Sequence, residues 1–316
     1  MKDGHGRDIN YLRVSVTDKC NLRCGYCMPG EGIRHLLHED MLSFEEIQRI
    51  VCIMTELGIK KVRLTGGEPL IRRGVTELVK MLSCDVYMTT NGCELAHLAK
   101  PLKEAGLCGI NISLDTLDRD TFRRLTGRDE FERVLDGIEA AVAVGLDVKL
   151  NCVPLKGIND PEIEDLCRFA AQKGLDLRFI ELMPIGCADG YRGVSTDELI
   201  RRLERDAGKM EPDASDSPGP AVYYRIGNRS SRIGFISPMS SKFCSSCNRV
   251  RLTAEGFLKL CLQYPDGLDL RRLLRSGSDD EAIRQAIEEA IRLKPRGHSF
   301  GNDQRSDKRK MVQIGG

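Results

Sequence analysis

The chain has 316 residues, which is enough for one large domain or for a large domain with a smaller one beside it. Its net charge is only +1 with 30% charged residues, so we expect no nucleic-acid partner and no anionic membrane partner. No apolar run is long enough to cross a bilayer and no signal peptide is recognisable, which predicts a cytoplasmic protein. In a reducing compartment, thirteen cysteines favour metal ligation over disulfides.

Short β-branched runs alternate with amphipathic segments through the first 183 residues. We predict strands at 12–16, 61–64, 85–88, 109–113, 148–153 and 177–182, with helices between them. One helix begins at Ser43, which forms a capping box with Glu46. Six strand–helix units predict a parallel sheet with right-handed crossovers. Periodicity leaves a partial barrel and an open doubly wound sheet as alternatives.

The pattern changes after Met183. We predict a helix at 196–205, a turn-rich segment at 213–220, two short strands at 222–226 and 232–236, and a strong helix at 279–293. Residues 296–310 are polar and basic, and we expect them to be mobile or draped over the surface. We place the domain boundary so that residues 1–207 form the strand–helix domain and 208–316 a smaller C-terminal domain.

Three cysteines follow the first predicted strand at the spacing C-x3-C-x2-C: Cys20, Cys24 and Cys27. Closely spaced thiolates hold iron–sulfur clusters, and three of them leave one iron of a four-iron cluster open to a small molecule. A three-cysteine zinc site is the alternative. After the second strand, Thr65-Gly66-Gly67-Glu68-Pro69 permits close backbone approach to a ligand and supplies a carboxylate at Glu68.

A second group of cysteines, Cys244, Cys247 and Cys261, has the spacing C-x2-C-x13-C. It also lacks a fourth cysteine, as in a catalytic site, although zinc is again an alternative. Arg249 and Arg251 follow on one side of a short extended segment, and paired guanidinium groups bind phosphates. This group therefore indicates a second metal centre beside an anion.

The first cysteine motif and the Gly-Gly-Glu-Pro loop resemble those of the radical S-adenosylmethionine (SAM) superfamily. With "RLTGGEPL" at 63–70, "MTTNG" at 88–92, "GINISLDTLD" at 109–118, "RFIELMP" at 178–184, "SSKFCSSCNRVRL" at 240–252 and a Gly-Gly terminus, the chain resembles the GTP 3′,8-cyclase family, the molybdenum cofactor biosynthesis protein A family. The resemblance covers essentially the whole chain. It implies an α/β fold, a partial (βα)6 TIM-like barrel with a smaller C-terminal α+β domain that carries a second cluster.

The resemblance also implies an activity. A radical formed from SAM would convert GTP to 3′,8-cyclo-7,8-dihydro-GTP in the first step of molybdenum cofactor biosynthesis, with an electron donor as a partner and a homodimer as the assembly. Two [4Fe-4S] clusters would be held by Cys20, Cys24 and Cys27 and by Cys244, Cys247 and Cys261. SAM would be contacted by Tyr26, Gly67, Ser113 and Met183. GTP would be contacted by Arg13, Arg63, Thr89 or its neighbour Thr90, Lys149, Arg249 and Arg251. The Gly-Gly tail would reach toward the active site.

Other interpretations stay open. The basic residues in the predicted strands are surface ion pairs in most proteins, and Met183 has core packing as its ordinary role. A radical SAM enzyme that modifies a peptide or protein, with an auxiliary cluster, is the alternative enzyme. A zinc-bound binding protein without catalysis is the alternative from another class.

Overall fold

The structure is a computed structural model that describes residues 1–213, 219–226, 231–300 and 307–315. Its strands form one sheet of order β12-β11-β10-β1-β2-β3-β4-β5-β6-β9-β8-β7. The central strands are β1 (Tyr11–Ser15), β2 (Lys61–Thr65), β3 (Asp85–Thr90), β4 (Gly109–Ser113), β5 (Asp147–Cys152) and β6 (Asp176–Ile180). None of the helices in these ranges is long and apolar enough to cross a membrane.

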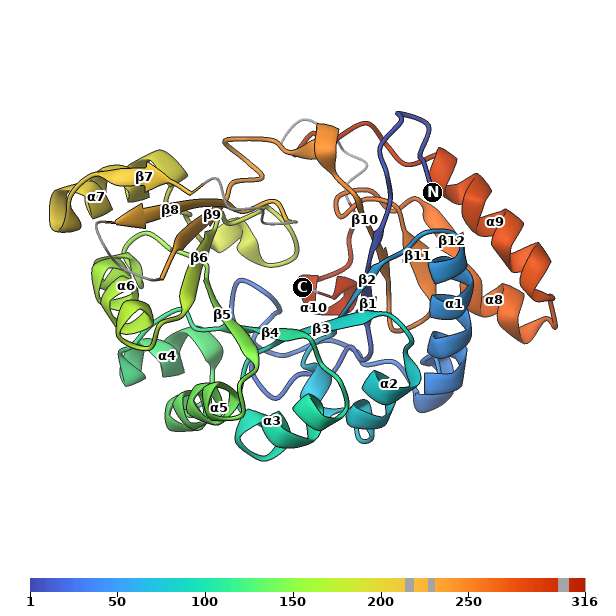
Figure 1. Ribbon diagram of the computed structural model, residues 1–316, viewed down its shortest axis with the longest axis horizontal. Coiled ribbons are helices and arrows are strands. Elements are labelled where there is room, and N and C mark those ends of the chain that lie inside the picture. Colours follow the sequence, from blue (N-terminus) through green and yellow to red (C-terminus); the bar gives the residue numbers. More distant parts are fainter. Residues whose placement is uncertain (214–218, 227–230, 301–306, 316) are drawn as a thin grey trace.

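The six central strands are parallel neighbours in sequence order. A doubly wound sheet would reverse its strand order, whereas this order never reverses, so all the crossover helices lie on one face and the sheet curls around the other. Figure 1 shows the helices on the outside of the resulting open barrel. These helices are α1 (Phe44–Glu56), α2 (Val75–Met81), α3 (Leu95–Glu104), α4 (Arg119–Thr126), α5 (Phe131–Ala143) and α6 (Ile163–Gln172). The predicted partial barrel is confirmed.

The strands alternate between two environments. In β1, Leu12 and Val14 are fully buried against the helices, whereas Tyr11 and Arg13 face the interior of the barrel. The apolar face of α1, with Ile47, Ile50, Val51 and Met54, is buried against the sheet. Burial of this apolar layer stabilises the packing of the helices on the convex face of the sheet. Because side chains alternate between the two faces of a strand, the polar residues between the apolar ones point to the concave side.

The C-terminal part of the chain extends both edges of this sheet. It contributes α7 (Thr196–Ala207), β7 (Met210–Pro212), β8 (Val222–Ile226), β9 (Ile233–Ile236), β10 (Arg249–Leu252), β11 (Phe257–Lys259), β12 (Gly267–Asp269), α8 (Leu270–Arg275) and α9 (Asp280–Arg292). Strand β9 pairs parallel with β6, and β10 pairs parallel with β1. Residues beyond the predicted boundary at 207/208 are therefore continuous with the barrel through backbone hydrogen bonds, and the boundary itself stays a prediction.

The last residues run inside the barrel. Helix α10 (Met311–Ile314) lies at the centre of the molecule in Figure 1, with Val312 and Ile314 buried. Asp307 accepts a hydrogen bond from the fully buried Lys259, and His298 lines the barrel interior. The expectation that 296–310 drapes over the surface is thus wrong for the parts at 296–300 and 307–310. Arg7 donates to the Arg296 carbonyl, the Ser299 amide donates to Gln263, and Lys259 holds Asp307. Residues 301–306 lie outside the described ranges.

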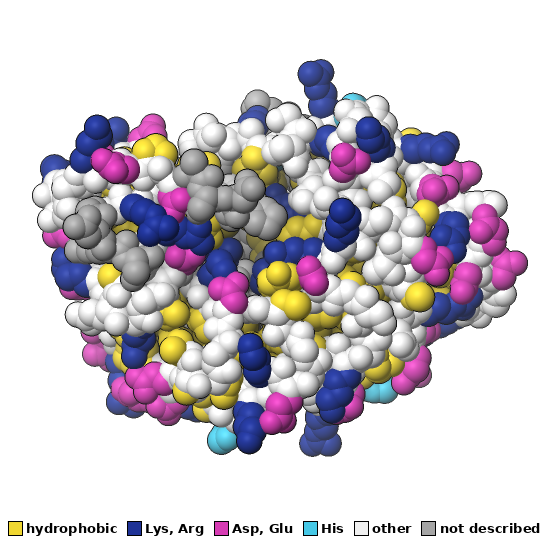
Figure 2. All heavy atoms as spheres, viewed as in Figure 1, with side chains coloured by type: hydrophobic (Ala, Val, Ile, Leu, Met, Phe, Trp, Pro, Cys, Tyr) yellow, Lys and Arg dark blue, Asp and Glu magenta, His cyan; other side chains and the backbone are white. Residues whose placement is uncertain are grey.

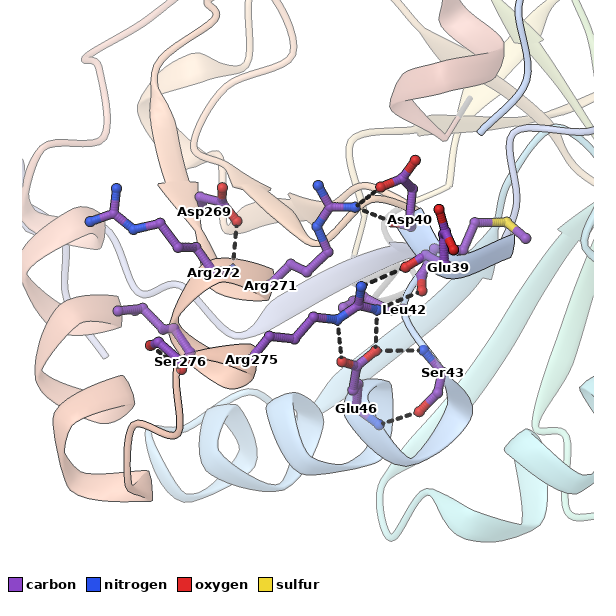
Figure 3. A network of polar contacts seen from close by, with 12 residues as sticks. Glu39, Asp40, Leu42, Ser43, Glu46, Asp269, Arg271, Arg272, Arg275 and Ser276 are labelled. Atoms are coloured by element: carbon purple, nitrogen blue, oxygen red, sulfur yellow. Dashed lines mark hydrogen bonds and ion pairs between the residues drawn. The ribbon is translucent and has the colours of Figure 1, made fainter. Parts of the chain in front are cut away.

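Two arginines of α8 hold the segment that leads into α1. Arg275 donates to the Glu46 carboxylate at 2.8 and 3.1 Å, and Arg271 donates to the Asp40 carbonyl at 2.6 Å. Glu46 also accepts from the Ser43 backbone at 2.7 Å, which completes the predicted capping box. Figure 3 shows Arg271 and Arg275 pointing toward these partners, while Arg272 points away.

Replacing Arg275 by Met should therefore lower the free energy of unfolding by at most about 1 kcal/mol, because these charge-assisted hydrogen bonds are exposed to solvent. For a chain of this size the midpoint of thermal unfolding should fall by about 2 °C. Arg272→Met, on the same helix, is the matched control and should leave the midpoint unchanged. Equal midpoints for both variants would show that the α8 contacts add nothing to stability.

Candidate active site

A cavity of about 540 Å³ fills the interior of the barrel, and both cysteine trios line it together with inward residues of β1 to β6 and β10. Figure 2 shows the molecule hollowed at the centre of this face, where hydrophobic side chains and dark-blue Lys and Arg side chains gather. Each predicted site residue also lines this cavity. Residues that lie up to about 250 positions apart in the sequence thus meet in one cavity.

The first trio lies on a loop that follows β1 and is held by backbone contacts. The amides of Arg23 and Gly25 donate to the Thr126 and Leu125 carbonyls at 2.7 and 3.0 Å, which fasten the loop to the end of α4. Gly25 has no room for a side chain, since a Cβ there would meet the Tyr191 hydroxyl at 2.0 Å. The three cysteines therefore lie on a loop whose conformation is fixed by its contacts with the end of α4 and with Tyr191.

The Gly-Gly-Glu-Pro loop packs directly beneath this cysteine loop. A Cβ on Gly67 would lie 2.2 Å from the Lys19 carbonyl oxygen, so glycine is required there for packing as well as for any ligand. The Glu68 carboxylate is buried and accepts from the Leu70 amide, the Thr90 hydroxyl and the Asn91 amide at 2.6 to 2.9 Å. Burial raises the pKa of Glu68 to about 7. Its carboxylate is thus committed to joining the loops after β2 and β3, and is not an open ligand.

The thiols of the first trio suit a metal cluster. Burial raises the pKa of Cys20 to about 11, with a contribution from the Glu68 carboxylate, and that of Cys27 to about 12, with contributions from Cys20 and Cys187. Metal binding replaces such protons, because thiolate is the form that ligates. Within the described ranges, no three His, Cys, Asp or Glu side chains are grouped so as to hold a single metal ion.

The second trio comes from two separate segments. Cys244 begins the short 3-10 helix Cys244–Ser246, Cys247 precedes β10, and Cys261 follows β11. Burial favours the protonated form of Cys247, but the positive charges of Lys294, Arg249 and Arg7 outweigh it and lower the pKa of this thiol. Glu181, buried at the end of β6, accepts from the Met239 and Ser240 amides at 2.9 Å and fixes the chain that leads to Cys244.

A tyrosine and a carboxylate lie beside the first trio. The Tyr26 hydroxyl donates to Asp115 at 2.6 Å, and Asp115 also accepts from the Val153 amide at 2.8 Å. Burial raises the pKa of both side chains. Ser113, at the end of β4, and Met183, after β6, line the same cavity. Met183 is therefore not a core residue, as its half-exposed side chain also shows.

Basic residues form a row across three neighbouring strands. The register places Arg13 of β1 opposite Arg63 of β2 on one side and opposite Arg251 of β10 on the other. Burial lowers the pKa of Arg13 to about 10, and Arg63 and Arg249 contribute to the shift. Among the described residues, nine Lys or Arg but only four Asp or Glu line the cavity. Such crowding of like charge is relieved by an anionic ligand.

The other residues predicted to contact GTP, Lys149 and Thr89 or Thr90, differ in the hydrogen-bond partners that they already have. Lys149 makes an ion pair with Asp147 at 2.6 Å, so it is already neutralised. The buried Thr89 hydroxyl has no hydrogen-bond partner within the described part of the chain. In contrast, the Thr90 hydroxyl donates to Glu68 at 2.7 Å. The geometry therefore favours Thr89, rather than Thr90, as the threonine with a hydroxyl available to a ligand.

Sequence reasoning missed several residues of the cavity. Tyr11 and Lys61 face inward beside Arg13 and Arg63, two residues away along β1 and β2, and Arg63 donates to the Tyr11 hydroxyl at 2.6 Å. Arg178 of β6 lines the cavity and donates to Asn151 at 2.9 Å. The period of two along each strand was the signal that could have found them.

The C-terminal tail reaches this site. Arg251 donates to the Gly315 carbonyl at 2.8 Å. Gly315 adopts φ +81°, and a Cβ there would lie 2.7 Å from the Thr65 hydroxyl and 2.9 Å from Ser15. Only glycine fits between β1 and β2 at this point, which confirms for Gly315 the expectation that the tail enters the barrel; Gly316 lies outside the described residues.

Comparisons with known proteins agree with this geometry. The sequence profile of the radical SAM superfamily matches residues 14–170, and that of the Molybdenum Cofactor Synthesis C family matches 175–300. The chain is 45% identical to the GTP 3′,8-cyclase of Petrotoga mobilis, over all of both chains. It is also 45% identical to that of Peptoclostridium acidaminophilum, over all of this chain and 98% of the relative.

Among solved structures, the chain is similar to Streptococcus suis SuiB bound to S-adenosylmethionine, with a TM-score of 0.65 at 16% identity over 91% of this chain and 68% of SuiB. SuiB bound to the precursor peptide SuiA gives a TM-score of 0.62 at 16% identity, over 98% of this chain and 71% of SuiB. At this level of identity the similarity concerns the fold.

Proposed function

The chain belongs to the GTP 3′,8-cyclase family of the radical SAM superfamily, and we propose that it converts GTP to 3′,8-cyclo-7,8-dihydro-GTP, the first step of molybdenum cofactor biosynthesis. One observation carries the proposal: two incomplete cysteine trios and a row of arginines line the same cavity. A nucleoside triphosphate can then lie between the two metal centres while its charge is neutralised.

The cofactors are two [4Fe-4S] clusters and SAM. Cys20, Cys24 and Cys27 would hold the first cluster, and Cys244, Cys247 and Cys261 the second. When bound, the first cluster with SAM supplies one-electron chemistry, and the second supplies an open iron for the guanine base. The protein contributes position: the loop contacts to α4 set the first trio, and Glu181 sets the approach to the second.

We assign SAM to the part of the cavity beside the first trio, where Tyr26, Gly67, Ser113 and Met183 lie. Gly67 lets the Gly-Gly-Glu-Pro backbone lie against the cysteine loop, so its peptide groups border the site. Asp115 fixes the Tyr26 ring through the 2.6 Å hydrogen bond. Since Glu68 is engaged by protein donors, the backbone of this loop and not that carboxylate is proposed to receive the amino group of SAM.

Asp115→Ala should weaken SAM binding about tenfold, because loss of a buried hydrogen bond to a carboxylate costs roughly 1.5 kcal/mol and frees the Tyr26 ring. Asp115→Asn keeps an acceptor at the same place and should bind SAM nearly as the parent does. Anaerobic calorimetric titration with SAM measures both. An unchanged affinity of the alanine variant would remove Asp115 from the account of this site.

We assign the triphosphate to the basic row of Arg13, Arg63, Arg249 and Arg251, with Lys149 and Thr89 as further contacts. Arg13 and Arg251 are partly buried and repel one another, and a bound triphosphate replaces that repulsion with charge-assisted hydrogen bonds. Inside the barrel the effective dielectric constant is lower than in bulk water, which strengthens these contacts.

The decisive experiment is anaerobic incubation with SAM, GTP and a chemical reductant, followed by mass spectrometry of the products. Formation of 5′-deoxyadenosine together with a cyclised GTP is expected. The competing function, modification of a peptide, predicts SAM cleavage that GTP does not stimulate. That result, in protein carrying both clusters, would exclude the cyclase.

We further propose that the enzyme works in the cytoplasm as a homodimer and takes electrons from a one-electron donor. All thirteen cysteines are free thiols, which suits a reducing compartment. Analytical ultracentrifugation of the protein with its clusters tests the dimer.

A further inference from the structure

Two buried cations, Arg7 and Lys294, lie beside the second cysteine trio, and the phosphate assignment above uses neither of them. Arg7, only 9% exposed, precedes β1. It donates to the Cys244 carbonyl at 2.8 Å and to the Arg296 and Pro295 carbonyls at 2.8 and 2.7 Å. The Nε group of Arg7 donates to the Asp3 carboxylate at 2.6 Å. Arg7 therefore joins the first cysteine of the trio to the segment 295–296.

Lys294 begins this same segment and is 3% exposed. Its ammonium group donates to the Arg249 carbonyl at 2.9 Å and to the Leu260 carbonyl. Arg249 stands two residues after Cys247, and Leu260 immediately precedes Cys261. Lys294 therefore joins the second and third cysteines, so the two cations together reach all three cysteine-bearing stretches.

The segment after Lys294 is pressed against the trio. A Cβ on Gly297 would lie 3.1 Å from the Cys244 Cβ and 3.4 Å from its sulfur. No cysteine ligand comes from this segment, yet it contacts the backbone around each of them. Segment 294–297 therefore links β10, the end of β11 and the short helix at 244–246.

The charges of the two cations are balanced differently. Arg7 is paired with Asp3, which is buried with it. Among the described residues, no carboxylate lies within ion-pair distance of Lys294, and the Arg249 and Leu260 groups that accept its hydrogen bonds are neutral carbonyls. A buried cation without a counter-charge is costly. Its closest source of negative charge is the trio itself, and three thiolates around an iron–sulfur core carry net negative charge.

We propose that Lys294 and the Arg7–Asp3 pair are positioning residues for the second cluster: they brace its three cysteine-bearing stretches through backbone carbonyls, and the Lys294 charge offsets that of the cluster. The inference rests on the second cluster of the proposed function. It assigns to the 294–297 segment a role in holding and tuning that cluster, without contact to SAM.

Lys294→Met tests both parts, because it keeps the length of the side chain but removes the donors and the charge. After anaerobic reconstitution, we expect iron and sulfide to fall by about half, the share of one cluster in two. The electron paramagnetic resonance signal and SAM binding of the first cluster should be kept. Lys294→Gln, which keeps donors without charge, should retain more iron but give the second cluster a lower midpoint potential, since a lost positive charge disfavours reduction.

Lys103→Met is the matched control, since Lys103 also donates to a backbone carbonyl, that of Gly145 at 2.8 Å, but at the barrel exterior. It should keep both clusters. If Lys294→Met does not fold, Lys294→Gln decides alone. Parental iron content and parental potential in the Lys294 variant that folds would overturn the inference. An unsubstituted protein that binds only one cluster would instead refute the proposed function.

Discussion

Replacing Cys261 by Ser should abolish cyclisation of GTP while SAM is still cleaved. The first trio depends on contacts of its loop with the end of α4 and with Gly67, and none of these involves residue 261. The second trio, in contrast, would keep only two thiolates. Without a fixed base, the ribose is no longer held against the radical source, and misplacement of this kind costs on the order of 10²-fold or more in rate.

The measurement is the yield of 5′-deoxyadenosine and of cyclised product in the same anaerobic reaction. Cys52→Ser, which changes an exposed cysteine of α1, is the control and should behave as the unsubstituted protein. Cyclised product at the parental rate from Cys261→Ser would mean that the second trio does not position the substrate. Loss of SAM cleavage as well would mean that the two halves of the cavity are not independent.

Replacing Arg251 by Ala should weaken GTP binding by roughly 10- to 100-fold, as expected for the loss of about 1.5–3 kcal/mol of charge-assisted hydrogen bonding. Arg251 lies next to Arg13 of β1 and opposite Lys259 of β11 in the sheet register. Arg251→Lys keeps the positive charge but loses the paired guanidinium donors. Its affinity for GTP should therefore lie between that of the unsubstituted protein and that of Arg251→Ala. The first cluster should be intact in both variants.

Arg251 has a second partner, because it also donates to the Gly315 carbonyl. Deleting residues 315–316 removes that partner and leaves the arginine in place. Equilibrium binding of GTP to both variants therefore separates the roles: the arginine substitution should cost more affinity than the deletion. Equal losses would assign Arg251 to docking of the tail, and unchanged affinity in Arg251→Ala would exclude it from phosphate binding.

Much of the secondary structure could be predicted because it depends on patterns within short stretches of the sequence. Alternation of period two and the capping box at Ser43 located the strands and α1 close to their observed bounds. The choice between a barrel and an open sheet could not be made this way. It depends on which strands pair, and the pairing of β10 with β1 joins residues some 240 positions apart, for which no local pattern exists.

By itself, the sequence determined the two cysteine trios, since their spacing lies within single loops or hairpins. It also indicated that Arg13, Arg63 and Lys149 face inward from their strands, but it missed Lys61 and Arg178. Only the tertiary structure decided that Thr89 is available while Thr90 is bound to Glu68, that the Glu68 carboxylate is used internally, and that Arg7 and Lys294 lie beside Cys244, Cys247 and Cys261. The reason is physical: spacing fixes distances along one stretch of backbone, whereas the partner of a buried polar group is set by closure of the sheet, which brings distant segments within hydrogen-bonding reach.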